Sequence, residues 1–319
     1  MNYYIGIDLG GTNIAAAVVD ENYKIIGRGN KKTNCPRPAE EIVDDMARAA
    51  RLAAEDAGLS LNDIKSVGVG SPGSVNPITG VIATSNNLGF KNLPLGAMLK
   101  ERLGFDVYLE NDASAAAYGE FIAGAGVGTK DFIAITLGTG VGGGIIINEK
   151  LFSGFNFAGG ELGHTVIVVD GEQCTCGRRG CWEAYASATG LIRITKKAML
   201  KDPDSKMWEL CGKSLDKVNG RTAYDGMRAK DRTACAVVDE YVKYVGCGIA
   251  NIINIFQPEI LCIGGGISKE GDTLLNPVKK YVATEDYAKT NTKQTQIKIA
   301  KLGNDAGIIG AAFLHRPYK

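Results

Sequence analysis

The chain lacks the features that mark several large classes of protein. Its 36 Lys and Arg residues nearly balance 35 Asp and Glu, and no basic cluster is long enough to form a nucleic-acid-binding face. No apolar run approaches the roughly 20 residues of a membrane span, since "YVGCGIANIINIF" is shorter and contains two asparagines. The first residues lack a basic region and a cleavage site. We therefore expect a cytoplasmic protein with no nucleic-acid or membrane partner.

The chain also lacks the G-x-x-x-x-G-K-[ST] motif, which argues against a P-loop NTPase. Glycine itself is abundant, with 42 residues, which is about twice the average usage. Such an excess indicates many tight turns or backbone that lies close to a ligand.

Predicted strands and helices are mixed in the order of an α/β protein. The segments "YYIGIDL" and "IAAAVVD" are predicted strands. Apolar residues at helical intervals predict a helix over "AEEIVDDMARAARLAAEDAGL", with Gly58 just past its end. A final helix is predicted over "NDAGIIGAAFLHR", with an Asn/Asp cap at its start.

Two glycine-rich segments resemble each other. The segment "IGIDLGGTNIAAAVVD" from Ile5 aligns without gaps on "IAITLGTGVGGGIIIN" from Ile133, which indicates duplicated halves rather than a solenoid. Either turn alone is an ordinary hairpin, but a matched pair can donate backbone N–H groups to one polyphosphate. Asp8 can hold Mg²⁺ through water. The predicted nucleotide-binding residues are Asp8, Gly10, Gly11, Thr12, Asn13, Gly138, Thr139, Gly140, Gly264, Gly265 and Gly266.

One carboxylate stands where a strand meets a helix. The segment "VYLENDASAAAYGEFIAG" predicts a strand ending near Leu109 and a helix beginning near Ala113. Asn111 or Asp112 can cap that helix. Alternatively, Asp112 is a general base that accepts a proton from a substrate hydroxyl during phosphoryl transfer. The segment by itself leaves both interpretations open.

Three of the eight cysteines cluster close to a histidine. His164, Cys174, Cys176 and Cys181 form the pattern H-x9-C-x-C-x4-C. A disulfide between the first two cysteines would close a strained ring, and redox motifs prefer C-x-x-C. Three thiolates and one imidazole complete a tetrahedral zinc site, which leaves no position for water. We therefore predict a structural zinc ion.

The motifs "DLGGTN", "SPG", "LEND", "LGTGVGGG", "GGELGH" and "CTCGRRGCWE" occur in this order over essentially the whole chain. In this combination the chain resembles the ROK family of repressors, open reading frames and sugar kinases, and within it the bacterial ATP-dependent glucokinase group. The resemblance implies two α/β domains with the actin/hexokinase-like (ribonuclease H-like) fold, and a homodimer or dimer of dimers. We expect a small domain at residues 1–115, joined by a C-terminal helix at about 305–319, and a large domain at 116–304 that carries the zinc knuckle.

The resemblance also implies a reaction. With ATP and Mg²⁺, the enzyme phosphorylates the 6-hydroxyl of glucose and yields glucose 6-phosphate and ADP, with Asp112 as the base. His164 is then both a zinc ligand and a sugar contact, its ring oriented by the metal. The implied sugar-binding residues are Asn87, Asn111, Asp112, Glu161, His164 and Glu183.

Other activities stay open at this point. Kinases for N-acetylmannosamine share the zinc cluster and both glutamates, and fructose, allose, mannose or a polyphosphate donor are further alternatives. The loop "SNNLGF" favours glucose. Repressors of the family carry a helix-turn-helix domain, whereas the first strand here is predicted from Tyr3. A non-catalytic sugar sensor is disfavoured because Asp8 and Asp112 are both present.

Overall fold

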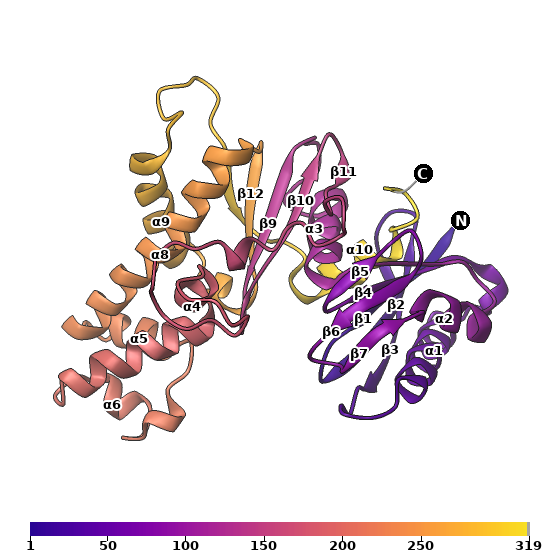
Figure 1. The fold of residues 1–319 in the computed structure, drawn as a ribbon, viewed down its shortest axis with the longest axis horizontal. Coiled ribbons are helices and arrows are strands. Elements are labelled where there is room, and N and C mark those ends of the chain that lie inside the picture. Colours follow the sequence, from indigo (N-terminus) through magenta and orange to yellow (C-terminus); the bar gives the residue numbers. More distant parts are fainter. Residues whose placement is uncertain (318–319) are drawn as a thin grey trace. The chain divides into compact units, whose positions relative to one another are not determined.

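The computed structural model describes residues 1–317, in which strands and helices are mixed along the chain (Figure 1). The strands are β1 (Tyr3–Leu9), β2 (Asn13–Asp20), β3 (Ile25–Lys32), β4 (Ile64–Ser71), β5 (Ser74–Asn76), β6 (Val81–Ser85), β7 (Phe90–Leu93), β8 (Val107–Asn111), β9 (Phe132–Leu137), β10 (Val141–Ile147), β11 (Lys150–Leu151), β12 (Ile260–Gly264) and β13 (Gln296–Ile299). The α-helices are α1 (Ala39–Asp56), α2 (Leu95–Leu103), α3 (Asp112–Ala123), α4 (Glu183–Ala186), α5 (Ala188–Lys201), α6 (Met207–Leu210), α7 (Thr222–Arg228), α8 (Arg232–Phe256), α9 (Asp272–Glu285) and α10 (Ala306–Ala312).

The chain divides into two compact units. Unit 1 contains Met1–Ala134, Gly144–Gly160 and the chain from Lys301 onward, and unit 2 contains Ile135–Gly143 and Glu161–Ala300. This division differs from the expected boundary after residue 115. Helix α3 belongs to unit 1 because it packs along α10, so the chain leaves unit 1 later than we expected from the sequence.

The two five-stranded sheets share one topology. The first has the order β3-β2-β1-β4-β8 and the second the order β11-β10-β9-β12-β13. In the first sheet β2 is antiparallel to β3, and β4 is parallel to β8. The corresponding pairs of the second sheet have the same directions, because β10 is antiparallel to β11 and β12 is parallel to β13. The repeated order supports the duplication that the two glycine-rich segments indicated.

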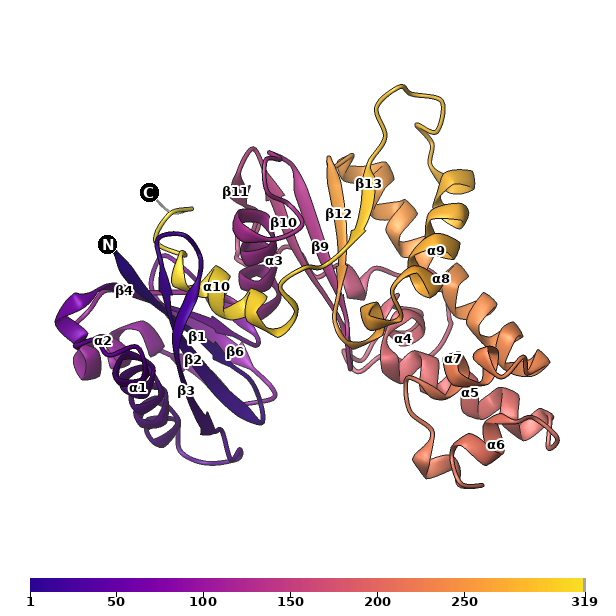
Figure 2. The same cartoon turned by 180° about the vertical axis from the view of Figure 1, so that it is seen from behind.

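Helices cover both faces of the first sheet. Alternate β1 residues Ile5, Ile7 and Leu9 are fully buried in the core that includes α1. On the opposite face α10 packs directly on the strands (Figure 2). A Cβ atom on Gly6 would lie 1.9 Å from the carbonyl oxygen of Ile308, and one on Gly68 would lie 1.9 Å from that of Ala311. Glycine at these two positions is therefore required for α10 to approach the sheet.

Two predicted helix ends have different outcomes. Gly58 has a φ of +67° after the end of α1, which confirms its predicted place beyond the helix. The C-terminal helix is shorter than the expected 305–319, because α10 ends at Ala312, and residues 318 and 319 lie outside the described residues. Phe313 leaves the helix and is fully buried against Tyr4 and Tyr23.

A buried carboxylate fixes the start of the C-terminal segment. Glu120 on α3 is only 3% exposed. Its oxygens accept hydrogen bonds from the backbone N–H groups of Ala125, Lys301 and Leu302, at 2.9, 3.1 and 2.6 Å. Hydrogen bonds to an ionised group are stronger than neutral ones, so Glu120 holds residues 301–302 beside α3 and directs the chain into α10.

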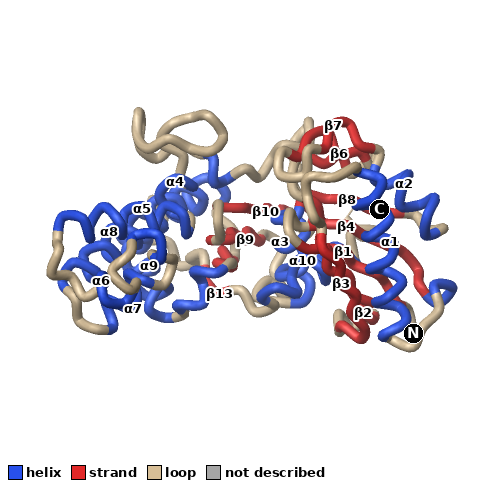
Figure 3. Tube along the Cα trace, turned by 90° about the horizontal axis from the view of Figure 1, so that it is seen from below, coloured by secondary structure: helices blue, strands red, loops and turns tan. Residues whose placement is uncertain are grey.

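Unit 2 is rich in helices (Figure 3). The longest, α8, packs against α5, α7 and α9. Trp182 is fully buried, donates its indole N–H to the carbonyl of Tyr244 at 2.8 Å, and packs on Gly248 of α8. Trp182 thus joins the segment after the last cysteine of the cluster to α8. Within residues 1–317, no helix combines the length and apolarity that crossing a membrane requires.

Candidate functional site

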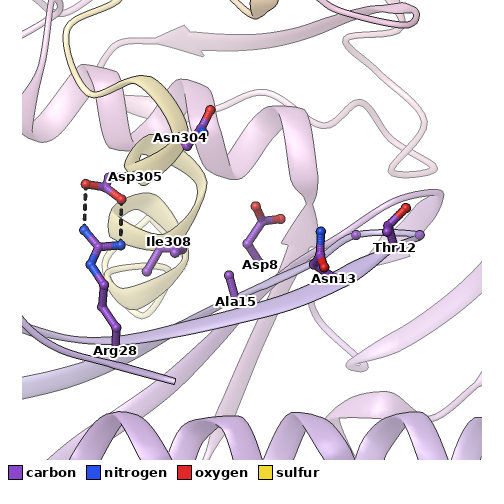
Figure 4. Close-up of a pocket in the computed structure, with 10 residues that line it drawn as sticks. Asp8, Thr12, Asn13, Ala15, Arg28, Asn304, Asp305 and Ile308 are labelled. Carbon is purple, nitrogen blue, oxygen red and sulfur yellow. Dashed lines mark hydrogen bonds and ion pairs between the residues drawn. The ribbon is translucent and has the colours of Figure 1, made fainter. Parts of the chain in front are cut away.

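The first glycine turn opens a cavity in unit 1. Gly10 donates its backbone N–H to the carbonyl of Asn13 at 2.9 Å, which closes the turn between β1 and β2. The hydroxyl of Thr33 donates to the carbonyl of Gly10 at 2.6 Å and holds the turn from outside. The cavity measures about 420 Å³ (Figure 4) and is lined by Asp8, Gly10, Gly11, Thr12, Asn13, Ala15, Arg28, Asn304, Asp305 and Ile308.

Two carboxylates of this unit, Asp8 and Asp112, have raised pKa values. Burial, and secondarily the charge of Asp112, raise the pKa of Asp8 to about 6. Burial also raises the pKa of Asp112, although hydrogen bonds from the start of α3 oppose that rise. The Asp8 carboxylate accepts no hydrogen bond from the described residues. A buried carboxylate of this kind is suited to a divalent cation, which would offset its unfavourable burial.

The raised pKa of Asp8 predicts a pH-dependent stability. Between about pH 4 and 6 the folded protein binds more protons at Asp8 than the unfolded chain, so this group lowers stability as the pH rises. Above about pH 6 the full penalty applies. We expect Asp8→Asn to be more stable than the wild type at pH 8, by about 1–3 kcal/mol, and similar in stability near pH 4. Thermal unfolding without ligands at both pH values measures this, and a difference that does not change with pH would contradict it.

Three polar residues that line this cavity were not identified from the sequence. Arg28 and Asp305 form a two-bond ion pair, with both N–O distances 2.9 Å, and Asn304 lies next to them. The expected Asn/Asp cap of the last helix corresponds to Asp305, which is the N-cap residue of α10. Its side chain makes no capping hydrogen bond and pairs with Arg28 instead. Arg28 gave no sequence signal, since one arginine in a strand resembles any solvated charge.

The structure shows which residue of the "LEND" motif caps helix α3. Asn111 is the N-cap of α3: its side-chain oxygen accepts from the N–H groups of Ala113 and Ser114, and its amide donates to the carbonyl of Gly73. Asp112 is the first residue of the helix, and one carboxylate oxygen accepts from Ala113 at 2.9 Å. The Asn111 side chain also forms a hydrogen bond with this carboxylate. Because Asn111 serves as the cap, the Asp112 carboxylate remains the candidate general base.

The predicted sugar loop "SNNLGF" joins β6 to β7 in unit 1. Asn86 and Asn87 are exposed, whereas Leu88 is 4% exposed and packs in the core of the unit. Leu88 thus anchors the turn and leaves the asparagine side chains on its surface.

In unit 2, the second glycine turn lies against the end of β12. Gly138 donates its N–H to the carbonyl of Gly140 at 3.0 Å within the turn between β9 and β10. A Cβ atom on Gly265 would lie 2.5 Å from the carbonyl oxygen of Leu137. The structure therefore brings the 138–140 turn and residues 264–266 together, as the predicted nucleotide-binding set of this half requires.

The four predicted metal ligands converge in unit 2. The ligand atoms of His164, Cys174, Cys176 and Cys181 all lie within 4.8 Å of one another. The Sγ atoms of Cys176 and Cys181 are 3.6 Å apart, and Cys174 Sγ is 3.7 Å from His164 Nδ1. With zinc–sulfur bonds of about 2.3 Å and zinc–nitrogen bonds of about 2.1 Å, a tetrahedron places its ligands roughly 3.6–3.8 Å apart. The donor set and its spacing therefore fit zinc.

Two glutamates flank this cluster. His164 Nε2, the ring nitrogen turned away from the cysteines, lies 3.9 Å from Glu161 Oε2. Glu183 accepts from the hydroxyl of Thr175 at 3.1 Å through Oε1 and from the N–H of Val141 at 2.9 Å through Oε2. The cluster thus orients the histidine, and its loop contacts one of the two glutamates.

Known proteins resemble this chain over almost its whole length. A glucokinase from Halalkalibacterium halodurans is 39% identical over 317 residues, which cover 98% of this chain and 94% of that protein. A glucokinase from Thermotoga maritima is 38% identical over 310 residues, which cover 97% of this chain and 95% of that protein.

The fold is equally similar. The crystal structure of a ROK family glucokinase from Streptomyces griseus, in complex with glucose and AMPPNP, has 37% sequence identity and a TM-score of 0.83, and the match covers 98% of this chain and 99% of that one. This confirms the expected fold of the ROK sugar kinases. The sequence model of the ROK family matches residues 4–317, and the chain therefore belongs to the ROK family.

Proposed function

We propose that this protein catalyses the ATP-dependent phosphorylation of glucose at its 6-hydroxyl. It is a hexokinase-type phosphotransferase, and its products are glucose 6-phosphate and ADP. The observation that carries the proposal is the half-buried carboxylate of Asp112 at the start of α3, with Asp8 and the first glycine turn in the same unit. The similarity to glucokinases that cover nearly the whole chain supports glucose as the substrate.

Asp112 acts as the general base. The 6-hydroxyl oxygen attacks the γ-phosphorus of ATP while its proton passes to the Asp112 carboxylate, and the bond from that phosphorus to the β–γ bridging oxygen breaks. Burial raises the pKa of Asp112 above its ordinary value, which makes its carboxylate a stronger base. The contact with Ala113 keeps the carboxylate in a fixed orientation.

The glycine turns bind the nucleotide in this proposal. Backbone N–H groups of Gly10–Asn13 and Gly138–Gly140 donate to phosphate oxygens, and Gly264–Gly266 lie under the base. Asp8 would hold Mg²⁺, which would neutralise the charge of the phosphates. The carboxylate of Asp8 is partly buried and accepts no hydrogen bond within residues 1–317, which supports this role.

The sugar-binding residues remain those predicted from the motifs. We assign Asn87, Asn111, Asp112, Glu161, His164 and Glu183 to the sugar hydroxyls. The position of Glu161 beside Nε2 of His164 supports the pairing of these two residues. Because the side-chain oxygen of Asn111 caps α3 and its amide donates to Gly73, its sugar contact requires either bifurcated bonds or exchange of the Gly73 bond.

We also propose a bound metal ion, an oligomeric state and a cellular compartment for this protein. His164, Cys174, Cys176 and Cys181 hold a structural zinc ion, which the spacing of their ligand atoms supports. We also propose a homodimer or dimer of dimers and a cytoplasmic role in glycolysis. None of the eight cysteines forms a disulfide, which is compatible with a reducing compartment.

A panel of sugars tests the function. ADP release from ATP and Mg²⁺ should be strong with glucose and weak with mannose, N-acetylmannosamine, fructose and allose. Preference for another hexose would be consistent with the same reaction. It would indicate that contacts around Glu161 and Glu183 select a different sugar. If folded and metal-loaded protein released no ADP with any of these sugars, ATP-dependent hexose phosphorylation would be contradicted. Polyphosphate would then be tested as the phosphoryl donor.

A further inference from the structure

We propose that Glu183 and Thr189 are positioning residues that hold the second glycine turn in the conformation that binds nucleotide phosphates. The inference rests on the proposed kinase function and adds a role for the segment between them, residues 183–189, which follows the last cysteine of the metal cluster. The turn concerned is Gly138–Val141, and every contact that carries the argument lies within unit 2.

Three hydrogen bonds join this segment to the turn. Val141 donates its N–H to Glu183 Oε2 at 2.9 Å, and Ala188 donates its N–H to the carbonyl of Gly138 at 2.8 Å. The hydroxyl of Thr189 donates to the carbonyl of Thr139 at 2.9 Å. These bonds occupy two carbonyls and one N–H of the turn. None of them uses the N–H groups of Thr139 and Gly140, which are the groups that can donate to phosphate oxygens.

The Glu183 carboxylate is itself held from the other side. Its Oε1 accepts from Thr175 at 3.1 Å and lies 3.6 Å from Cys174 Sγ. A Cβ atom on Gly140 would lie only 2.3 Å from Oε2, so the carboxylate packs directly on the turn. Glu183 thus fixes the position of the turn relative to the loop that carries the metal ligands.

Thr189 is placed by the start of α5. Ser187 caps this helix by accepting a hydrogen bond from the N–H of Gly190 at 3.0 Å. Because the first turn of the helix is fixed in this way, the backbone N–H of Ala188 and the hydroxyl of Thr189 are presented together to adjacent carbonyls of the glycine turn. Nothing in the local sequence signals this contact, because the paired residues are 50 positions apart.

Nucleotide binding in the absence of sugar separates positioning from sugar contact. A residue that only binds sugar does not alter this affinity, whereas loosening the turn does. The probe is ADP with Mg²⁺, titrated calorimetrically into zinc-loaded protein, with a parallel titration of glucose alone and a metal analysis of every variant. Thr189→Val removes the hydroxyl at nearly constant volume, and Thr189→Ser restores it. Thr195→Val is the matched control, because Thr195 on the same helix bonds only to the carbonyl of Leu191.

We expect Thr189→Val to weaken ADP binding about three- to ten-fold, as the loss of one hydrogen bond implies, and to leave glucose affinity and metal content unchanged. Thr189→Ser should lie within about two-fold of the wild type. Glu183→Gln should also weaken ADP binding without sugar. Unchanged ADP affinity in both Thr189→Val and Glu183→Gln, or an equal loss in Thr195→Val, would overturn the inference. If the wild type itself binds no nucleotide, the proposed function fails and this inference fails with it.

Discussion

Replacing Asp112 with Asn should lower kcat by about 10²–10⁴-fold while sugar binding is retained. The amide keeps the shape of the carboxylate and can still accept the hydrogen bond from Ala113, but it cannot take the proton of the sugar hydroxyl. A misplaced or absent general base typically costs a loss of this size. Steady-state ADP release gives kcat, and glucose titration without nucleotide gives the sugar affinity.

Asp106→Asn provides the control for this variant. Asp106 is an exposed carboxylate in unit 1 that pairs with Lys100, and its replacement should leave kcat within about two-fold of the wild type. If Asp112→Asn turned over glucose within ten-fold of the wild type, the assignment of the base would be wrong. A large loss in both variants would point to a general effect of charge rather than to proton transfer.

The wild-type protein should contain about one zinc ion per chain, and Cys181→Ser should lose it. Cys181 is fully buried among the predicted ligands. Without the metal, three thiols and an imidazole would be packed together with no cation to hold them. Structural zinc sites contribute directly to the free energy of folding. A loss of several kcal/mol would lower the Tm by about 10 °C or more in a chain of this size.

Metal analysis and thermal unfolding measure both effects. Cys235→Ser is the matched control, because this half-buried cysteine on α8 lies outside the cluster, and it should keep its zinc and most of its thermal stability. A purified, active and unchelated wild-type protein that contains no zinc would refute the site. Retention of zinc by Cys181→Ser would show that this thiol is not a ligand.

These two predictions could be made from the sequence because they rest on local patterns. The cluster ligands occur within 18 consecutive residues, from His164 to Cys181, so short loops alone bring three of them close together. Asp112 stands at a strand–helix junction that periodicity and capping residues identify. The two hairpins could also be predicted, because a few glycine-rich residues join β1 to β2 and β9 to β10.

The residues that support the site could not be predicted from the sequence. Arg28 and Asp305 are 277 positions apart, so nothing local revealed that the aspartate pairs with an arginine instead of capping a helix. The same holds for Glu183 and Val141, which are 42 positions apart. Contacts of this kind depend on where whole sheets and helices pack, and no spacing rule in a single sequence encodes that.

The sequence alone determined the chemistry that each unit of this protein can offer: a carboxylate base, two glycine turns and a Cys3His cluster. Local geometry suffices for these, because hairpins, helix starts and metal knuckles are built from neighbouring residues. Only the tertiary structure decided how they are held. Glu120 directs the C-terminal segment onto the first sheet, and Glu183 and Thr189 secure the second turn. These contacts form only when distant segments of the chain pack together. A buried polar group then needs a hydrogen-bond partner, and the fold decides which residue is close enough to provide it.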